Sequence, residues 1–401
     1  MLSYEKTPRW NVYCFIAAAM CFWYTIYAYS PIVSTYAQSL GASFSMVGVI
    51  SSAYGFTQLT LRIPIGIMSD RLGSCKPFVI AGLLSSLVSG AVVLLWKDPV
   101  AVLISRALTG VTAATWVPMT VMFTNYFESR QGQSAISVLN SLSQLGKLVA
   151  NLLCGYIIAV HSRDGVFIAA IISASAGLAI AFFLVEAKIS AGSVSDRNRP
   201  DKGMGLSSAL AAISSPGTLF ASFLSLLSQY IGFATVLGGF TPVYAKSIGA
   251  DDTQISLMIS ANTLMMVISA FHAPWIYNKL KYKKTLAIIF VVEIAVCVLV
   301  PLSLNVAILY ALLALDGIVR GVALPLLMNM AVKHVPAGSK ATAMGMYQAI
   351  YAGGIFAGPL LTGVISDNFG FSIGYYHNAA MGLLAIAAIS FYNWRKIEAL
   401  D

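Results

Sequence analysis

The chain has 401 residues, of which 58% are hydrophobic and only 10% are charged. A soluble domain carries about 25% charged residues, so the composition excludes a soluble globular protein and predicts a membrane protein. The formal net charge is +9, but the basic residues are scattered among short loops, which argues against a nucleic-acid-binding protein. The five cysteines lie mostly in apolar runs without metal-ligand spacing, so we expect no metal and no cofactor.

Apolar runs of about 20 residues, the length that crosses a bilayer as a helix, recur along the chain. In the first half we expect spans at 10–37, 44–69, 77–96, 99–125, 133–160 and 164–185. In the second half we expect spans at 208–244, 252–279, 284–304, 306–332, 340–366 and 372–394. The sequence therefore predicts an all-α membrane protein with twelve transmembrane helices.

A polar stretch at 186–206 separates the two sets of spans. The halves also resemble each other at an offset of about 208–210 positions, as in Leu152-Leu-Cys-Gly155 and Leu360-Leu-Thr-Gly363. We therefore expect an N-terminal six-helix bundle over 1–185, a linker over 186–206 and a C-terminal six-helix bundle over 207–401. One chain holds both halves, so we expect a monomer.

Most of the 24 lysines and arginines fall on one set of alternating loops and on the linker. Loops rich in lysine and arginine lie on the cytoplasmic side of a membrane. We therefore expect a multi-pass protein of the inner or plasma membrane with both termini and the linker in the cytoplasm.

The loop between the second and third spans carries a distinctive pattern. Glycines and charged residues occur at fixed positions, namely Gly66, Asp70, Arg71, Gly73 and Lys76. On spacing alone this is a tight charged turn between two membrane helices. The pattern also resembles the signature G-x-x-x-D-R-x-G-x-x-K of the major facilitator superfamily, although Ser74 and Cys75 stand where basic residues are common.

That resemblance implies a secondary transporter that works by alternating access, with its substrate site at the midplane between the two halves. It also implies that the signature residues Gly66, Asp70, Arg71 and Gly73 act as a conformational gate, and we expect Arg62 to join them.

The fifth span carries a stripe of polar residues. Successive members are separated by 3, 4, 3 and 4 positions and so share one helix face: Ser137, Asn140, Gln144, Lys147 and Asn151. Such a stripe must face protein or water. It either holds helices together by hydrogen bonds or binds substrate, with Lys147 as an anchor for an anion and Gln144 and Asn151 beside it.

Other charged residues inside the spans are candidates for function, because a charge in the bilayer normally faces a cavity or a partner. Arg106, with Gly110 four positions later, resembles a second superfamily motif whose arginine is associated with proton coupling, and it is also a candidate substrate ligand. Asp316 and Arg320 are four positions apart and can pair. The pair is either structural or a proton site whose protonation releases Arg320 to bind substrate.

Glu293 lies in the middle of the ninth span. It either pairs with another helix or is a protonated carboxyl that takes part in proton coupling.

Among the aromatic residues, Tyr27, Trp116 and Tyr351 are candidates for the walls of a substrate site, although tyrosine and tryptophan also gather at membrane interfaces. Tyr351 shares a helix face with Gly354 and Gly358, which suggests close packing at a hinge.

Four cations and two carboxylates inside the spans leave a surplus of positive charge. We therefore expect a transporter of a small anionic or zwitterionic organic solute, coupled to protons and embedded in the lipid bilayer. A multidrug or lipophilic-compound/proton antiporter is the alternative, although the Gly-Pro motif of drug antiporters is absent at Gly146-Lys147. A membrane-embedded enzyme is a remote alternative, because the four histidines are far apart in sequence and no catalytic constellation is evident.

Overall fold

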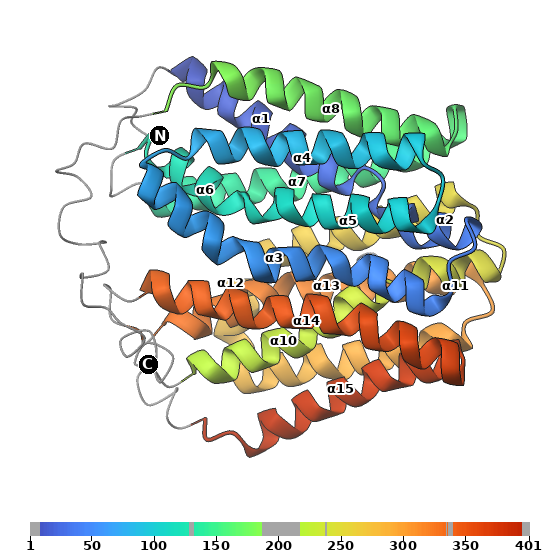
Figure 1. The fold of residues 1–401 in the computed structure, drawn as a ribbon. Coiled ribbons are helices and arrows are strands. Elements are labelled where there is room, and N and C mark those ends of the chain that lie inside the picture. Colours follow the sequence, from blue (N-terminus) through green and yellow to red (C-terminus); the bar gives the residue numbers. More distant parts are fainter. Residues whose placement is uncertain are drawn as a thin grey trace. The chain divides into compact units, whose positions relative to one another are not determined.

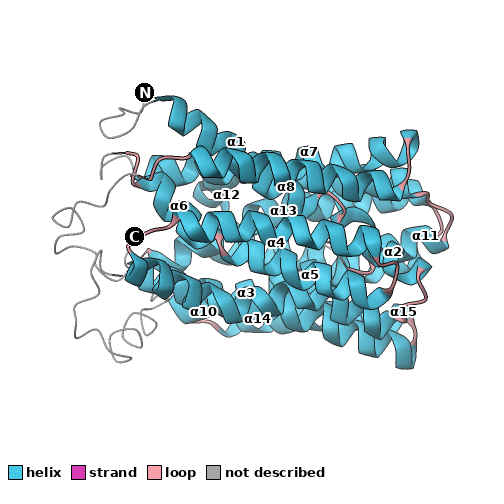
Figure 2. Ribbon diagram, turned by 45° about the horizontal axis from the view of Figure 1, so that its top comes forward, coloured by secondary structure: helices cyan, strands magenta, loops and turns pink. Residues whose placement is uncertain are grey.

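The structure is a computed structural model that describes residues 9–127, 132–186, 217–236, 239–333, 335 and 340–394. These residues form helices, turns and loops, and no strand occurs among them (Figure 2). Contacts divide the chain into two compact units, one comprising Met1–Ser190 with Ala250–Ser260 and the other comprising Ala191–Gly249 with Ala261–Asp401. The linker predicted at 186–206 lies outside the described residues, apart from Glu186.

Long helices packed along their lengths build the first unit (Figure 1). They are α1 (Arg9–Tyr27), α2 (Val33–Ser39), α3 (Phe44–Leu72), α4 (Lys76–Leu95), α5 (Pro99–Ala114), α6 (Trp116–Thr124), α7 (Gly132–Val160) and α8 (Arg163–Phe183), with a 3-10 turn at Ser30–Ile32. Helix α4 packs against α5 and α8, and α1 packs against α7 and α8. Helix α3 packs against α5.

The second unit is built around α10. Its helices are α10 (Thr218–Thr235), α11 (Thr241–Ser247), most of α12 (Asp252–Leu299), α13 (Val306–Val332), α14 (Lys340–Phe369) and α15 (Phe371–Phe391), with a 3-10 turn at Val300–Leu302. Helix α10 packs against α13, α14 and α15. Fully buried Ile231, Phe290 and Tyr347 belong to the apolar core of this unit.

The prediction of twelve spans is confirmed, while residues 208–216 and 237–238 of the seventh predicted span lie outside the described residues. Nine helical segments of the described residues are long and apolar enough to cross a membrane. One of them, Asp252–Leu302, is interrupted by the non-helical residue Lys281 and therefore forms two spans. Helices α3 and α15, with 29 and 21 residues, are the remaining two.

Polar residues at the helix starts define several of the turns between spans. The carboxylate of Asp98 accepts a hydrogen bond from the backbone N–H of Val100 at 2.8 Å, and Pro99 occupies the first position of α5. Asn305 caps α13 in the same way through the N–H of Ala307, also at 2.8 Å. Such caps satisfy backbone donors that have no partner within the helix, so these short sequences set where each span begins.

The turn after α3 and the turn within α12 each contain a residue with a positive φ, at equivalent places in the two halves. Gly73 has a φ of 62°, and Lys281, which lies 208 positions later, has a φ of 61° and a ψ of 171°. This combination at Lys281 belongs to a region of backbone space that is essentially reserved for glycine. The second half therefore places a lysine at a positive φ, where the first half has a glycine.

We expect opposite effects from substitutions at these two positions. Lys281→Gly should raise the free energy of unfolding by about 1 kcal/mol, because relief of backbone strain exceeds the added freedom of the unfolded chain. Gly73→Ala should lower it by about 1 kcal/mol, although no atom lies within 4 Å of the added methyl group. Thermal unfolding of the purified variants measures both, and shifts of the same sign would contradict the prediction.

Two glycines bring α14 into backbone contact with α10. A Cβ atom at Gly354 would collide with the carbonyl oxygen of Leu226, and one at Gly358 would collide with the carbonyl oxygen of Tyr230. Small residues allow membrane helices to approach this closely. The close packing expected for this face of α14 is therefore present, while its role as a hinge stays a prediction.

We expect Gly358→Ala to destabilise the protein by about 1–3 kcal/mol, because the methyl group must push α10 and α14 apart. Gly353 on the same helix provides a matched control, since a Cβ atom there would meet only the Leu226 side chain, at 3.9 Å. Thermal unfolding of both variants measures the difference. Equal losses would show that the close approach at Gly358 does not matter.

Hydrogen bonds fasten the segment that follows α8 to the rest of the first unit. The side chain of Asn11 on α1 accepts from the N–H of Val185 at 3.0 Å and donates to the Val185 carbonyl at 3.1 Å. The hydroxyl of Tyr126 donates to the same carbonyl at 2.9 Å. The next residue, Glu186, accepts from the Ser74 hydroxyl at 2.6 Å and from the backbone N–H of Cys75.

Candidate functional site

Lys147 lies against aromatic rings inside the first unit. Its Nζ atom, on α7, is 4.2 Å from the ring centroid of Trp23 and 5.1 Å from that of Tyr27, both on α1. Trp116 of α6 packs edge-on against Trp23, with centroids 4.9 Å apart. A cation over aromatic faces gains an electrostatic attraction, so these rings hold the ammonium group without neutralising its charge.

Arg106 and Arg62 are two further cations of this unit. The guanidinium carbon of Arg106, a residue that is 2% exposed, is 4.8 Å from the ring centroid of Tyr54 on α3. Arg62 donates a hydrogen bond from Nη2 to Oε1 of Gln58 at 2.7 Å. Within the described part of the chain, no carboxylate lies within 4.0 Å of Lys147 or Arg106. Buried Arg106 and half-buried Lys147 therefore carry positive charge that has no anionic partner among the described residues.

The rest of the polar stripe on α7 is only partly enclosed. Gln144 is half-buried, and its Oε1 atom is inaccessible to solvent and accepts no hydrogen bond among the described residues. Asn151 is buried, and its backbone carbonyl accepts a hydrogen bond from the Ser256 hydroxyl at 2.6 Å. Asn140 is exposed, and the side chain of Ser137 lies outside the described residues. The structure thus brings Gln144 and Lys147 to one helix face, one turn apart.

In the second unit, Asp316 and Arg320 form the predicted pair on α13. The Nε atom of Arg320 donates to both carboxylate oxygens of Asp316, at 2.9 and 2.8 Å. Asn262 of α12 donates to Asp316 Oδ2 at 3.0 Å. Because Asp316 is 1% exposed and Arg320 is 6% exposed, this is a buried ion pair with additional hydrogen bonds.

Glu293 of α12 joins this pair. Its Oε1 atom is 3.4 Å from Arg320 Nη1 and accepts a hydrogen bond from the Ser228 hydroxyl at 2.8 Å. Arg320 Nη1 also donates to the Ser228 carbonyl at 2.8 Å. Glu293 is fully buried. Two carboxylates therefore share one guanidinium group in a site shielded from solvent.

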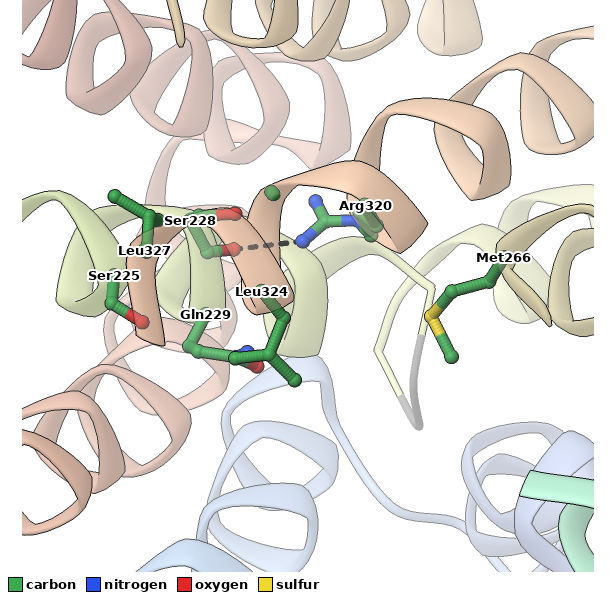
Figure 3. A pocket seen from close by; sticks show the side chains of 8 residues that line it. Ser225, Ser228, Gln229, Met266, Arg320, Leu324 and Leu327 are labelled. Atoms are coloured by element: carbon green, nitrogen blue, oxygen red, sulfur yellow. Dashed lines mark hydrogen bonds between the residues drawn. The ribbon is translucent and has the colours of Figure 1, made fainter. Parts of the chain in front are cut away.

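A small pocket of about 40 Å³ opens beside this cluster. Figure 3 shows the Arg320 side chain directed at Ser228, with Gln229 and Met266 on other sides of the pocket. A water molecule needs about 10–15 Å³ of such volume, so the pocket has room for water next to Arg320.

Three polar residues of these clusters were not predicted. Gln58 precedes Arg62 by four positions on α3 and could have been found from that spacing. Asn262 is a polar residue in an apolar span, which is also a detectable signal. Ser228 gave no signal, because serines are frequent along α10.

The remaining candidates lie apart from these clusters. Arg71 is exposed in the last turn of α3, Gly73 forms the turn described above, and Gly66 lies two turns earlier. The side chain of Asp70 lies outside the described residues. Tyr351 belongs to the second unit, where its ring packs against Tyr347 at 5.4 Å, so it is not grouped with Tyr27 and Trp116.

Comparisons with known proteins give a consistent result along the chain. The family model described as Major Facilitator Superfamily matches residues 15–237 and 218–398. The chain is 25% identical to the inner membrane transport protein YajR of Escherichia coli (strain K12) over 358 residues, which are 84% of this chain and 73% of that protein. It is 25% identical to multidrug resistance protein 1 of Bacillus subtilis (strain 168) over 243 residues, which are 60% of this chain and 59% of that protein.

A solved structure has the same fold. A bacterial homologue of the human lysosomal transporter Spinster, in an inward-facing and unoccupied conformation, superposes with a TM-score of 0.78 and covers 95% of each chain. The two sequences are 13% identical, so this likeness concerns the fold alone.

Proposed function

Because this chain belongs to the major facilitator superfamily, we propose that it is a proton-coupled secondary transporter of a small organic solute that carries negative charge, working by alternating access. The observation that supports the anionic substrate is the surplus of buried positive charge in the first unit. Lys147 and Arg106 contact aromatic rings, and no described carboxylate lies within ion-pair distance of either.

An anionic group on the substrate would supply the partner that these cations lack among the described residues. Lys147 offers three N–H donors and Arg106 offers five, and charge-assisted hydrogen bonds are about twice as strong as neutral ones. Gln144 lies one turn from Lys147 and offers both donors and an acceptor to the rest of the solute. Trp23, Tyr27 and Trp116 supply apolar walls beside the ammonium group.

The charged cluster in the second unit supports proton coupling. Asp316, Glu293 and Arg320 together carry a net charge of −1 when both carboxylates are ionised, and binding of one proton makes the cluster neutral. A net charge in a buried membrane site is unfavourable, so we propose that the cluster exchanges one proton per transport cycle. Protonation would also weaken the hold of the carboxylates on Arg320 and free that side chain to interact with substrate.

Export of lipophilic compounds is the second candidate function. It is favoured by the similarity to multidrug resistance protein 1 over 60% of this chain. The positive charges of Lys147 and Arg106 would, however, repel a lipophilic cation.

We also propose that the chain works as a monomer in the inner membrane with both termini in the cytoplasm, in agreement with the positive-inside rule.

The deciding experiment is thermal unfolding of the purified protein with a panel of small carboxylates, amino acids, sugars and lipophilic cations. A ligand that binds the folded state raises the melting temperature by mass action. We expect a rise with one class of small anion, and vesicle uptake of that anion driven by an imposed pH gradient. A rise with lipophilic cations alone would overturn the proposal and favour the exporter.

A further inference from the structure

The turn that divides α12 is strongly basic. It contains Lys279, Lys281, Lys283 and Lys284, and all four side chains are exposed. In the described part of the chain, no carboxylate lies within 4.0 Å of any of these four amino groups. Lys333, which follows α13, adds a fifth charge near this turn. Its Nζ atom lies 5.6 Å from the ring centroid of Tyr282, a residue of the turn that divides α12. Several like charges within one turn, with no described counter-charge, favour an anionic partner.

One of these lysines is held in a strained conformation. The φ of 61° and ψ of 171° at Lys281 are normal for glycine, and Gly73 occupies the equivalent place in the first half. The conformation is held by its neighbours, because Tyr282 is buried and the Thr285 hydroxyl donates to the Lys281 carbonyl at 2.7 Å. Strained residues cluster at functional sites, and the group that an exposed lysine offers to a ligand is its charge.

Exposed aromatic residues accompany the lysines along one face of α12. Phe271, Trp275 and Lys279 follow one another at intervals of four, and Phe271 and Trp275 are 72% and 63% exposed. The Lys279 Nζ atom is 5.3 Å from the Trp275 ring centroid. Tryptophan together with lysine at the end of a membrane span is the composition of the lipid headgroup region.

We propose that this basic turn binds the phosphate group of an anionic phospholipid. The amino groups of Lys279, Lys281, Lys283, Lys284 and Lys333 donate to the phosphate oxygens, while Trp275 and Phe271 contact the lipid below the headgroup. A lipid fits better than a soluble anion, because the exposed aromatic residues lie next to the charges. The site shares no residue with the clusters around Lys147 and Arg320, so the proposal does not depend on the transported solute.

The test uses the purified full-length protein in neutral detergent. The melting temperature is followed while a short-chain phosphatidylglycerol, a short-chain phosphatidylcholine or inorganic phosphate is added. We expect a saturable rise with phosphatidylglycerol and no rise with the other two. A rise of equal size with phosphatidylcholine or with inorganic phosphate would overturn the lipid assignment.

Variants of Lys281 separate its charge from its backbone strain. Lys281→Gln removes the amino group and keeps the strain, whereas Lys281→Gly removes both. Each should weaken phosphatidylglycerol binding about fivefold, the effect of one lysine at an anionic surface, but only Lys281→Gly should melt at a higher temperature without lipid. Lys97→Gln, which changes an exposed lysine on the loop before α5, should bind the lipid as the parent protein does. Unchanged lipid affinity in Lys281→Gln would contradict the proposal.

Discussion

Replacing Arg320 with methionine is expected to cause a large loss of stability, about 3–5 kcal/mol. The guanidinium group is the partner of the Asp316 carboxylate and lies 3.4 Å from Glu293. Without it, two buried carboxylates remain with no cation within the cluster. Unfolding of the purified variant by heat or denaturant measures the loss, and vesicle uptake under a pH gradient should be abolished.

A triple variant separates stability from proton coupling. Arg320→Met combined with Asp316→Asn and Glu293→Gln has no charge left in the cluster. Because removal of a whole buried ion pair is often nearly neutral, we expect most of the lost stability to return while proton-driven uptake stays absent. If Arg320→Met alone were as stable as the parent, Arg320 would not be the cation that stabilises the buried Asp316 and Glu293 carboxylates.

Replacing Lys147 with alanine is expected to weaken binding of the anionic substrate about 10–150-fold. A hydrogen bond to a charged group contributes about 1.5–3 kcal/mol, and 1.4 kcal/mol corresponds to a factor of ten. Stability should fall by no more than about 2 kcal/mol, the contribution of a cation over an aromatic ring, because the ammonium group has no described carboxylate partner that would be left unpaired. The dissociation constant is obtained from the ligand dependence of the melting temperature.

Lys147→Arg is the matched control, since it keeps the positive charge above Trp23 and Tyr27. It should retain more affinity than Lys147→Ala, although guanidinium and ammonium groups differ in geometry. Parent-like affinity and uptake rate in Lys147→Ala would exclude this residue as the anion anchor.

The fold could be predicted from the sequence because long apolar runs and short polar turns define membrane spans. The polar stripe on α7 could also be predicted, since the spacing along one helix fixes which side chains share a face. Asp316 and Arg320 pair for the same reason. These features depend only on the geometry of a single helix.

Contacts between helices could not be predicted in this way. The approach of Glu293 to Arg320 depends on how α12 and α13 are rotated about their own axes, and no spacing within either helix gives that rotation. The stacking of Arg106 on Tyr54 depends likewise on the packing of α5 against α3. The conformation of Lys281 was unpredictable for another reason, because lysine rarely adopts a positive φ.

The hydrogen bonds of Asn11 to Val185, and of Glu186 to Ser74 and Cys75, have a consequence for biogenesis. They join α1 and the turn between α3 and α4 to the two residues at 185 and 186, after α8, using only residues that are synthesised by the time the linker begins. Domains generally fold as they emerge, beginning at the N-terminus. We therefore expect the first six spans to be locked together in the membrane while the second half is still being made.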